Sequence, residues 1–201
     1  MTLQKLRWFQ AIGELAIPLL GYFYFDWSLY FILLFYFIDL IVTEVFTVVK
    51  VNRIIRFQQI NYPLHQRLKK IAVNSFLVLS LLTLSHVFIY YFNNNIVFWD
   101  EIWAFLTYEE PGFPVPQGII LFPLVFFGNY QQYTTFFVKM GLFRRFSWSA
   151  LLRSRRRALV IAILGTLLAI LLHTIFPAIP AILYLVVTLL VKFYVDVWLS
   201  P

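Results

Sequence analysis

The sequence predicts an all-α protein, a polytopic transmembrane helical bundle of about six spans, and three observations carry this prediction. Hydrophobic residues make up 62% of the chain and charged residues 12%, whereas soluble domains are about half apolar and a quarter charged. The apolar residues form runs long enough to cross a hydrocarbon core ~30 Å thick. The basic residues lie in the connectors of one side. We therefore expect a single transmembrane domain over residues 1–201, located in the cell membrane as a multi-pass protein.

Six apolar runs give the expected spans, which cover residues 8–25, 28–49, 71–92, 118–138, 158–176 and 178–198. The first run is predicted to be a retained span rather than a cleaved signal peptide, because Glu14 and Pro18 interrupt it and no small-residue cleavage pattern follows. A short turn that contains Trp27 separates the first two spans. Pro177 and Pro180 separate the last two, since a proline can end one helix and begin another.

Charge divides the connectors into two sets. Fifteen of the sixteen Lys and Arg residues lie before the first span, after the second or after the fourth, and the sixteenth, Lys192, lies near the same face. The connector 93–117 has no Lys or Arg and carries acidic residues instead. Because positively charged connectors stay in the cytoplasm, both termini are expected to be cytoplasmic. The net charge of +7 then sets orientation and attracts anionic headgroups, and no nucleic-acid partner is expected.

Two connectors have the composition of short amphipathic helices at a membrane surface. In the connector 93–117, aromatic residues at helical spacing predict a helix in the outer interface that could dock a partner; these are Phe98, Trp99, Trp103 and Phe105. The segment 142–157 predicts an inner-interface helix with lipid-facing arginines, namely Arg144, Arg145, Arg153, Arg155, Arg156 and Arg157. The alternative for each segment is a solvated loop that a few aromatic residues anchor.

Polar residues near the middle of two spans form the first candidate site. Asp39 lies at the centre of the second span and shares a helix face with Thr43. Asn129 lies at about the same depth in the fourth span, where Gln132 and Tyr133 share its face. If the carboxyl group contacts the amides inside the bundle, each can form the hydrogen bonds that the other needs. Such a site either only holds helices together or binds a substrate or a proton, because intramembrane acids are candidates for function.

A second group lies nearer the cytoplasmic ends of the spans. Glu14, Glu44 and Lys192 are at similar depths, and Asp196 is one turn beyond Lys192. This placement predicts an inner-leaflet ion pair between Lys192 and one of the three carboxylates. A proton relay through the carboxylates is one alternative, and a lysine that snorkels to the interface is another.

Cofactor and catalytic chemistry have little support in the sequence. His86 and His173 lie towards the outer ends of the third and fifth spans and could ligate a haem iron, although histidines there more often only form hydrogen bonds. No cofactor or metal is therefore expected. The chain has no cysteine, which excludes disulfides, thiolate metal sites and cysteine nucleophiles. It has no nucleophile elbow or phosphate-binding glycine loop, and only a lipid-active enzyme with a diffuse signature stays open.

Both ends of the chain carry a recognisable pattern. One stretch runs from Glu14 through Pro18 and the Trp27 turn to Asp39. The other is Lys192-Phe-Tyr-Val-Asp196, near the end of the chain. In these stretches the chain resembles an uncharacterised family of small bacterial multi-pass inner-membrane proteins. In that family a proline-containing span, a Trp turn and an aromatic–acid pair recur. The resemblance implies the multi-pass topology and implies no activity.

The sequence thus leaves three functions to compare. The favoured one is a non-enzymatic accessory or scaffold subunit of a larger membrane complex, whose partners are membrane lipids and other membrane proteins. The second is a small permease or proton-linked transporter with its site at Asp39, Asn129 and Gln132. The third is a haem-binding electron-transfer subunit that uses His86 and His173.

Overall fold

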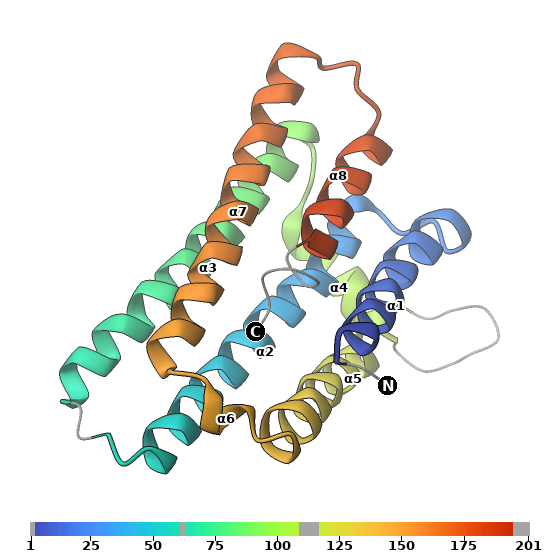
Figure 1. Cartoon of the computed structure of the whole chain (residues 1–201). Helices are drawn as coiled ribbons and strands as arrows, with labels where there is room; N and C mark the ends of the chain where they lie inside the picture. The colour runs from blue at the N-terminus through green and yellow to red at the C-terminus, as the bar shows by residue number, and fades with distance from the viewer. Residues whose placement is uncertain (1–2, 61–62, 109–116, 195–201) are drawn as a thin grey trace. The chain divides into compact units, whose positions relative to one another are not determined.

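A computed structural model of the chain describes residues 3–60, 63–108 and 117–194, and within these ranges helices joined by short connections make up the fold, without a β-strand (Figure 1). The elements in chain order are α1 (Leu3–Tyr24), α2 (Leu29–Phe57), α3 (Leu64–Phe92), α4 (Phe98–Thr107), α5 (Gln117–Gln132), the π-helical segment η1 (Tyr133–Lys139), α6 (Leu142–Arg145), α7 (Trp148–Ile175) and α8 (Ala181–Tyr194). The prediction of an all-α fold is confirmed.

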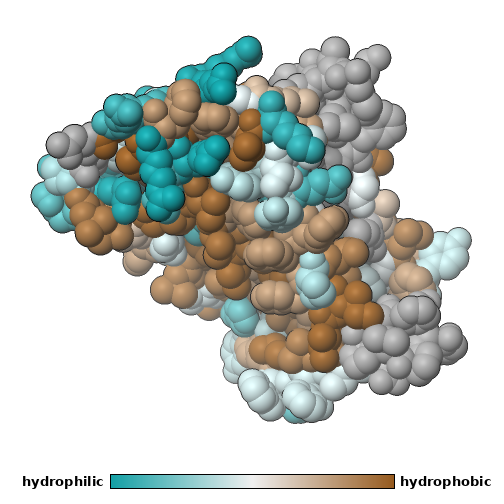
Figure 2. Space-filling view, turned by 90° about the horizontal axis from the view of Figure 1, so that it is seen from below, coloured by the Kyte–Doolittle hydropathy of each residue, from teal (hydrophilic) through white to brown (hydrophobic). Residues whose placement is uncertain are grey.

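Among the described residues, three helices are long enough and apolar enough to cross a membrane: α2 and α3 with 29 residues each and α7 with 28. The rest of the chain buries 44% of the most apolar stretch of α2 but only 22% of that of α3 and 11% of that of α7, so α3 and α7 leave most of their apolar surface uncovered. Figure 2 shows one face on which hydrophilic side chains gather in one area and hydrophobic side chains occupy much of the remainder. Water does not tolerate so wide an apolar surface, whereas lipid does.

The helices begin and end where local backbone chemistry permits. Ser28 caps α2, because its Oγ accepts a hydrogen bond from the Phe31 N–H at 3.1 Å. Asp26 makes the turn before this cap with a positive φ of 49°, a conformation that aspartate tolerates better than most residues. Helices α2 and α3 extend beyond the expected spans, to Phe57 and from Leu64. An apolar run marks the membrane-compatible part of a helix but not its whole length.

The expected single interfacial helix over 142–157 is wrong. The structure divides this segment into α6 and the first turns of α7. Gly141 precedes α6 with a φ of 69°, in the left-handed region that favours glycine. Ser147 then caps α7, with its Oγ accepting from the Ala150 N–H at 3.2 Å. The break lies between these helices, where the extended backbone of Phe146 ends α6 and the Ser147 cap begins α7, and it overrides the helical spacing of the apolar residues.

The contacts divide the chain into two compact units. Unit 1 comprises Met1–Leu33, Leu79–Ile96 and Ser154–Pro201, and unit 2 comprises Leu34–Val78 and Val97–Arg153. The expectation of one domain over the whole chain stays a prediction. In unit 1, α1 contacts α8, where the rings of Trp8 and Phe193 meet edge to face at 5.1 Å. A group of aromatic rings packs elsewhere in this unit, formed by Phe88, Phe92, His173 and Tyr184.

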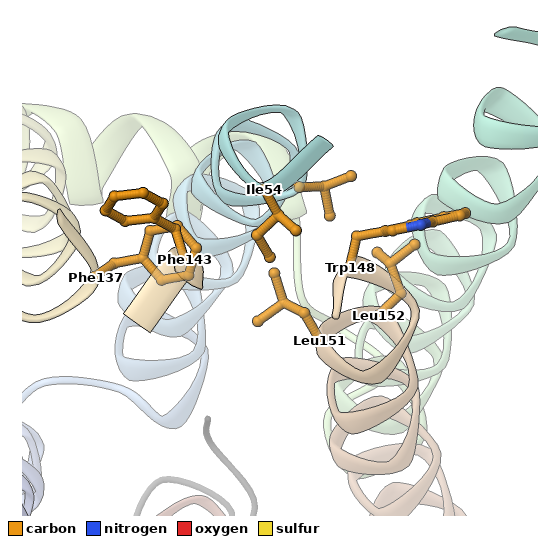
Figure 3. Close-up of a cluster of buried hydrophobic side chains, with 7 residues drawn as sticks. Ile54, Phe137, Phe143, Trp148, Leu151 and Leu152 are labelled. Atoms are coloured by element: carbon orange, nitrogen blue, oxygen red, sulfur yellow. The ribbon is translucent and has the colours of Figure 1, made fainter. Parts of the chain in front are cut away.

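Unit 2 has a hydrophobic core where the end of α2 meets η1, α6 and the start of α7 (Figure 3). Its buried members are Val51, Ile54, Phe137, Phe143, Trp148, Leu151 and Leu152. Basic side chains surround this aromatic–aliphatic core: Lys50 lies over the Phe137 ring at 5.9 Å, and Lys70 lies over the Trp148 ring at 4.5 Å. A compact core thus fixes four chain segments beside a set of cations.

Candidate polar site between helices α2 and α5

Helix α2 presents Asp39 and Thr43 one turn apart, so that both side chains lie on the same face. In unit 2 this face meets Asn129 of α5. The Asn129 Nδ2 donates to the Asp39 Oδ1 at 3.2 Å, and the Thr43 hydroxyl donates to the Asn129 Oδ1 at 3.1 Å. The structure therefore brings these three side chains into one hydrogen-bonded group, which we call the Asp39–Asn129 site.

Asn129 is the centre of this site and is only 9% exposed. Its Nδ2 also donates to the Val125 carbonyl oxygen at 3.1 Å, so both amide hydrogens are used. The Thr43 donor and the two acceptors together determine which way the amide points. On the other helix, the Thr47 hydroxyl donates to the Thr43 carbonyl oxygen at 2.8 Å. The amide is thus held in place with its donor group towards a half-buried carboxyl group.

Gln132 and Tyr133 follow in the chain and differ in their placement. Tyr133 lies one turn after Asn129 and also faces α2, with its ring 6.0 Å from that of Phe46, and it stacks on Phe137 at 5.9 Å. Gln132 is half-buried and is the last residue of α5. The backbone changes from α-helix to π-helix between these two residues. Such π-helical turns are often found at functional sites.

The expected inner-leaflet ion pair falls largely outside the described residues. The side chains of Glu14 and Lys192 and the whole of Asp196 are not described. Glu44 is described, and its side chain is 9% exposed on α2, directly after Thr43. Helix α2 thus carries a second, buried acid in unit 2, one residue after Thr43 in the chain.

The two histidines expected towards the outer ends of their spans each form hydrogen-bond contacts within unit 1. The His86 Nε2 lies 3.0 Å from the Tyr30 hydroxyl and its Nδ1 lies 2.8 Å from the Leu82 carbonyl oxygen. The His173 Nδ1 lies 3.3 Å from the Tyr184 hydroxyl. An iron at His86 would have to replace one of its two hydrogen bonds. Among the described residues, no three His, Cys, Asp or Glu side chains gather as a metal site.

Helix α4 has one anchored side and one exposed side. Trp99 and Trp103 are 70% and 59% exposed and lie one turn apart, whereas Phe105 is 2% exposed and Phe98 is half-buried. Helix α4 contacts α5 so closely that a Cβ added at Gly118 would meet the Phe105 carbonyl oxygen. Phe105 therefore belongs to the anchored side rather than to the expected docking surface. We call Trp99 and Trp103 the tryptophan pair.

The expected lipid-facing arginines lie on two helices. Arg144 and Arg145 are exposed on α6, while Arg153, Arg155, Arg156 and Arg157 lie in the first turns of α7, where Arg155 and Arg156 are half-buried. Arg144 lies over the rings of Phe57 and Phe143 at 5.6 and 5.5 Å. Arg53 of α2 lies 5.3 Å from the same Phe143 ring and was not among the arginines predicted to face lipid. The sequence feature that could have indicated it is its position just beyond the second span, among other basic residues.

In the part of the chain that the structure describes, these features define an all-α protein with three membrane-compatible helices and a hydrogen-bonded polar site between α2 and α5 within unit 2. Comparison with family models, with curated proteins and with solved structures found no match. The resemblance to a bacterial multi-pass family therefore stays a prediction, and function has to be argued from the geometry.

Proposed function

We propose that the chain is a six-span membrane protein with both termini in the cytoplasm, which acts as a non-enzymatic accessory subunit of a larger membrane complex. The three long apolar helices support membrane insertion. The remaining spans, α1, α5 with η1, and α8, follow from the apolar runs of the sequence. The separation of basic connectors from the acidic connector 93–117 supports the orientation.

The tryptophan pair is the observation that carries the accessory role. Tryptophan is among the residues that contribute most to protein–protein binding. Two of them project from one face of α4, while Phe105 and the close approach to Gly118 fix the opposite side to α5. A preorganised aromatic surface loses little conformational entropy when it binds. We infer that this surface contacts a partner membrane protein on the outer side.

The double substitution Trp99→Ala, Trp103→Ala should detach the partner without preventing membrane insertion. Truncation of an interface tryptophan costs about 2 kcal/mol or more, which is a loss of at least about tenfold in affinity. The measurement is extraction of native membranes in a mild detergent, followed by purification of the chain and quantification of the co-purified subunit.

Phe23→Ala is the matched control, because Phe23 is 64% exposed on α1 in unit 1 and should leave the complex intact. A wild-type chain that purifies alone and monomeric in several mild detergents contradicts the accessory role. Equal loss of partner in the double variant and in the control assigns the effect to general apolar exposure and also contradicts it.

A small permease is the second candidate, and the Asp39–Asn129 site favours it. An acid in a membrane-compatible helix is costly unless it has a role or a partner. Here a partner is the Asn129 amide of α5, one turn before the π-helical segment η1, and π-helical turns are often found at functional sites. Movement of α5 would alter the hydrogen bond between Asn129 and Asp39.

Asp39→Asn should abolish proton-linked uptake if this second candidate is correct. The asparagine retains an oxygen that can accept from Asn129 and removes the titratable group, so folding and insertion should change little. The measurement is uptake of a panel of labelled solutes into membrane vesicles, with and without a proton gradient. Asp100→Asn, at an exposed position on α4, is the control and should transport normally. Uptake that Asp39→Asn leaves unchanged for every transported solute contradicts the permease.

A further inference from the structure

Unit 2 contains a cavity beside its hydrophobic core, where the end of η1 turns into α6 against the last turns of α2. The cavity has a volume of about 420 Å³ and is lined by Arg53, Val138, Lys139, Met140, Gly141, Phe143, Arg144 and Arg145. This volume lies within the range of small-ligand sites, ~300–1,000 Å³. The lining comes from η1, α6 and the turn between them, together with Arg53 of α2, which is far away in the sequence, so the cavity depends on a tertiary contact.

Four cations and no carboxylate line this cavity: Arg53 from α2, Lys139 from η1, and Arg144 and Arg145 from α6. None of the four forms an ion pair within the part of the chain that the structure describes. Like charges held around one space repel each other, and the repulsion favours a bound anion. The arrangement is therefore complementary to a group that carries more than one negatively charged oxygen.

The core fixes the positions of two of the guanidinium groups. Phe143 is 6% exposed, and its ring lies 5.3 Å from the Arg53 guanidinium carbon and 5.5 Å from that of Arg144. A guanidinium that stacks on a ring retains in-plane N–H donors, which match the oxygens of a phosphate in pairs. Gly141, with its φ of 69°, forms the turn that returns Arg144 and Arg145 towards Lys139. The donors are preorganised by elements that do not depend on a ligand.

Apolar surface at the same place distinguishes a lipid from a soluble anion. Met140 lines the cavity and is 45% exposed, and Phe57, which contacts Arg144, is 49% exposed. A site for a soluble phosphate has no need of exposed apolar side chains at its rim, whereas acyl chains would cover them. Basic pockets at the cytoplasmic ends of membrane helices are suited to phosphate-containing headgroups.

We propose that this cavity is a specific binding site for the phosphate of an anionic phospholipid headgroup in the inner leaflet. The proposal rests on the membrane topology proposed above, because that topology places the end of α2 and α6 at the cytoplasmic face. It goes beyond diffuse attraction between basic residues and lipid, because it assigns the binding to Arg53, Lys139, Arg144 and Arg145. The arginines of α7 have no part in it.

The test is lipid binding by the full-length protein in detergent, read by native mass spectrometry as bound lipid per chain. The probes are cardiolipin, phosphatidylglycerol and phosphatidylcholine, with inorganic phosphate as a soluble competitor. The double variant Lys139→Gln, Arg145→Gln should bind the two anionic lipids at least tenfold more weakly. Arg53→Gln, Arg144→Gln should do the same, and phosphatidylcholine binding should not change. The first pair avoids the ring contacts of Phe143, so its effect does not depend on core packing.

Arg153→Gln, Arg157→Gln is the matched control, since it also removes two positive charges from exposed positions but not from the cavity. Less than a twofold change in this control supports the proposal. Equal weakening in the control and the cavity variants shows diffuse electrostatic attraction and overturns it. Binding of inorganic phosphate with the same variant sensitivity, but no lipid binding, assigns the cavity to a soluble anion and also overturns it.

The topology is tested separately, because the chain has no native cysteine. His65→Cys and Asn94→Cys, both at exposed positions, should react with a membrane-impermeant thiol reagent from opposite sides of the membrane. Labelling from the same side refutes the proposed topology, and lipid binding in detergent then still reports on the cavity itself. Failure of the lipid-binding test with correct labelling refutes the cavity proposal alone.

Discussion

Phe143→Ala should lower the free energy of unfolding by about 3–5 kcal/mol, the usual range for removal of a buried phenylalanine. The Phe143 ring is the common contact of several groups in unit 2. It meets the Phe57 ring edge to face at 4.8 Å, lies 6.4 Å from the Phe137 ring, and carries Arg53 and Arg144 beside it. Its loss leaves a cavity and also releases both guanidinium groups. We therefore expect the loss of stability to be accompanied by loss of anionic lipid binding.

Unfolding by titration with a denaturing detergent in mixed micelles, followed by circular dichroism, measures this change. Met140→Ala is the control, because Met140 is next to the same turn but 45% exposed, and its change should stay within about 0.5 kcal/mol. A Phe143→Ala protein as stable as the Met140→Ala protein would show that the core of unit 2 does not form as described.

Gly118→Ala should destabilise the protein by about 1–3 kcal/mol, the range for an added methyl group in a filled space. The new Cβ would overlap the Phe105 carbonyl oxygen, which belongs to the backbone and cannot rotate away. Helix α4 would have to move away from α5, and the exposure of the tryptophan pair would change with it. Tryptophan fluorescence during detergent titration follows both the unfolding and this displacement.

Gly128→Ala is the matched control within the same helix. Nothing lies within 4 Å of the position that its Cβ would occupy. Alanine is a better helix former than glycine by up to about 1 kcal/mol, so this variant should be as stable as the wild type or more so. The informative result is that the two substitutions change the free energy of unfolding in opposite directions. If Gly118→Ala also stabilises the protein, the close contact between α4 and α5 is refuted.

The all-α fold class could be predicted from the sequence, because long apolar runs and proline-containing turns are local signals. The break at Ser147 was also a local signal, a helix cap, but helical periodicity of the apolar residues on both sides outweighed it. The length of α2 was underestimated for a related reason. Residues 50–57 are polar enough to leave a hydrocarbon core but remain good helix formers next to an established helix.

The polar and basic sites show where sequence analysis ends. Asp39 and Asn129 could be paired because their depths follow from the order of the spans. Arg53 and Lys139 could not be assigned to one cavity, since this requires the end of α2 to lie against η1. The close approach of Gly118 to Phe105 is likewise tertiary, because a glycine at the start of a span gives no indication of which backbone it meets.

The π-helical geometry of η1 has a consequence for variants made between Tyr133 and Lys139. A widened turn adds one residue relative to an α-helix, which rotates all later positions by about 100° around the axis. Tyr133 and Phe137 stack with an angle of only 25° between their ring planes within this segment. An ideal helical wheel would thus assign positions such as Val138 and Lys139 to the wrong side of the cylinder. Cross-linking or scanning data in this stretch need to be plotted on the observed backbone.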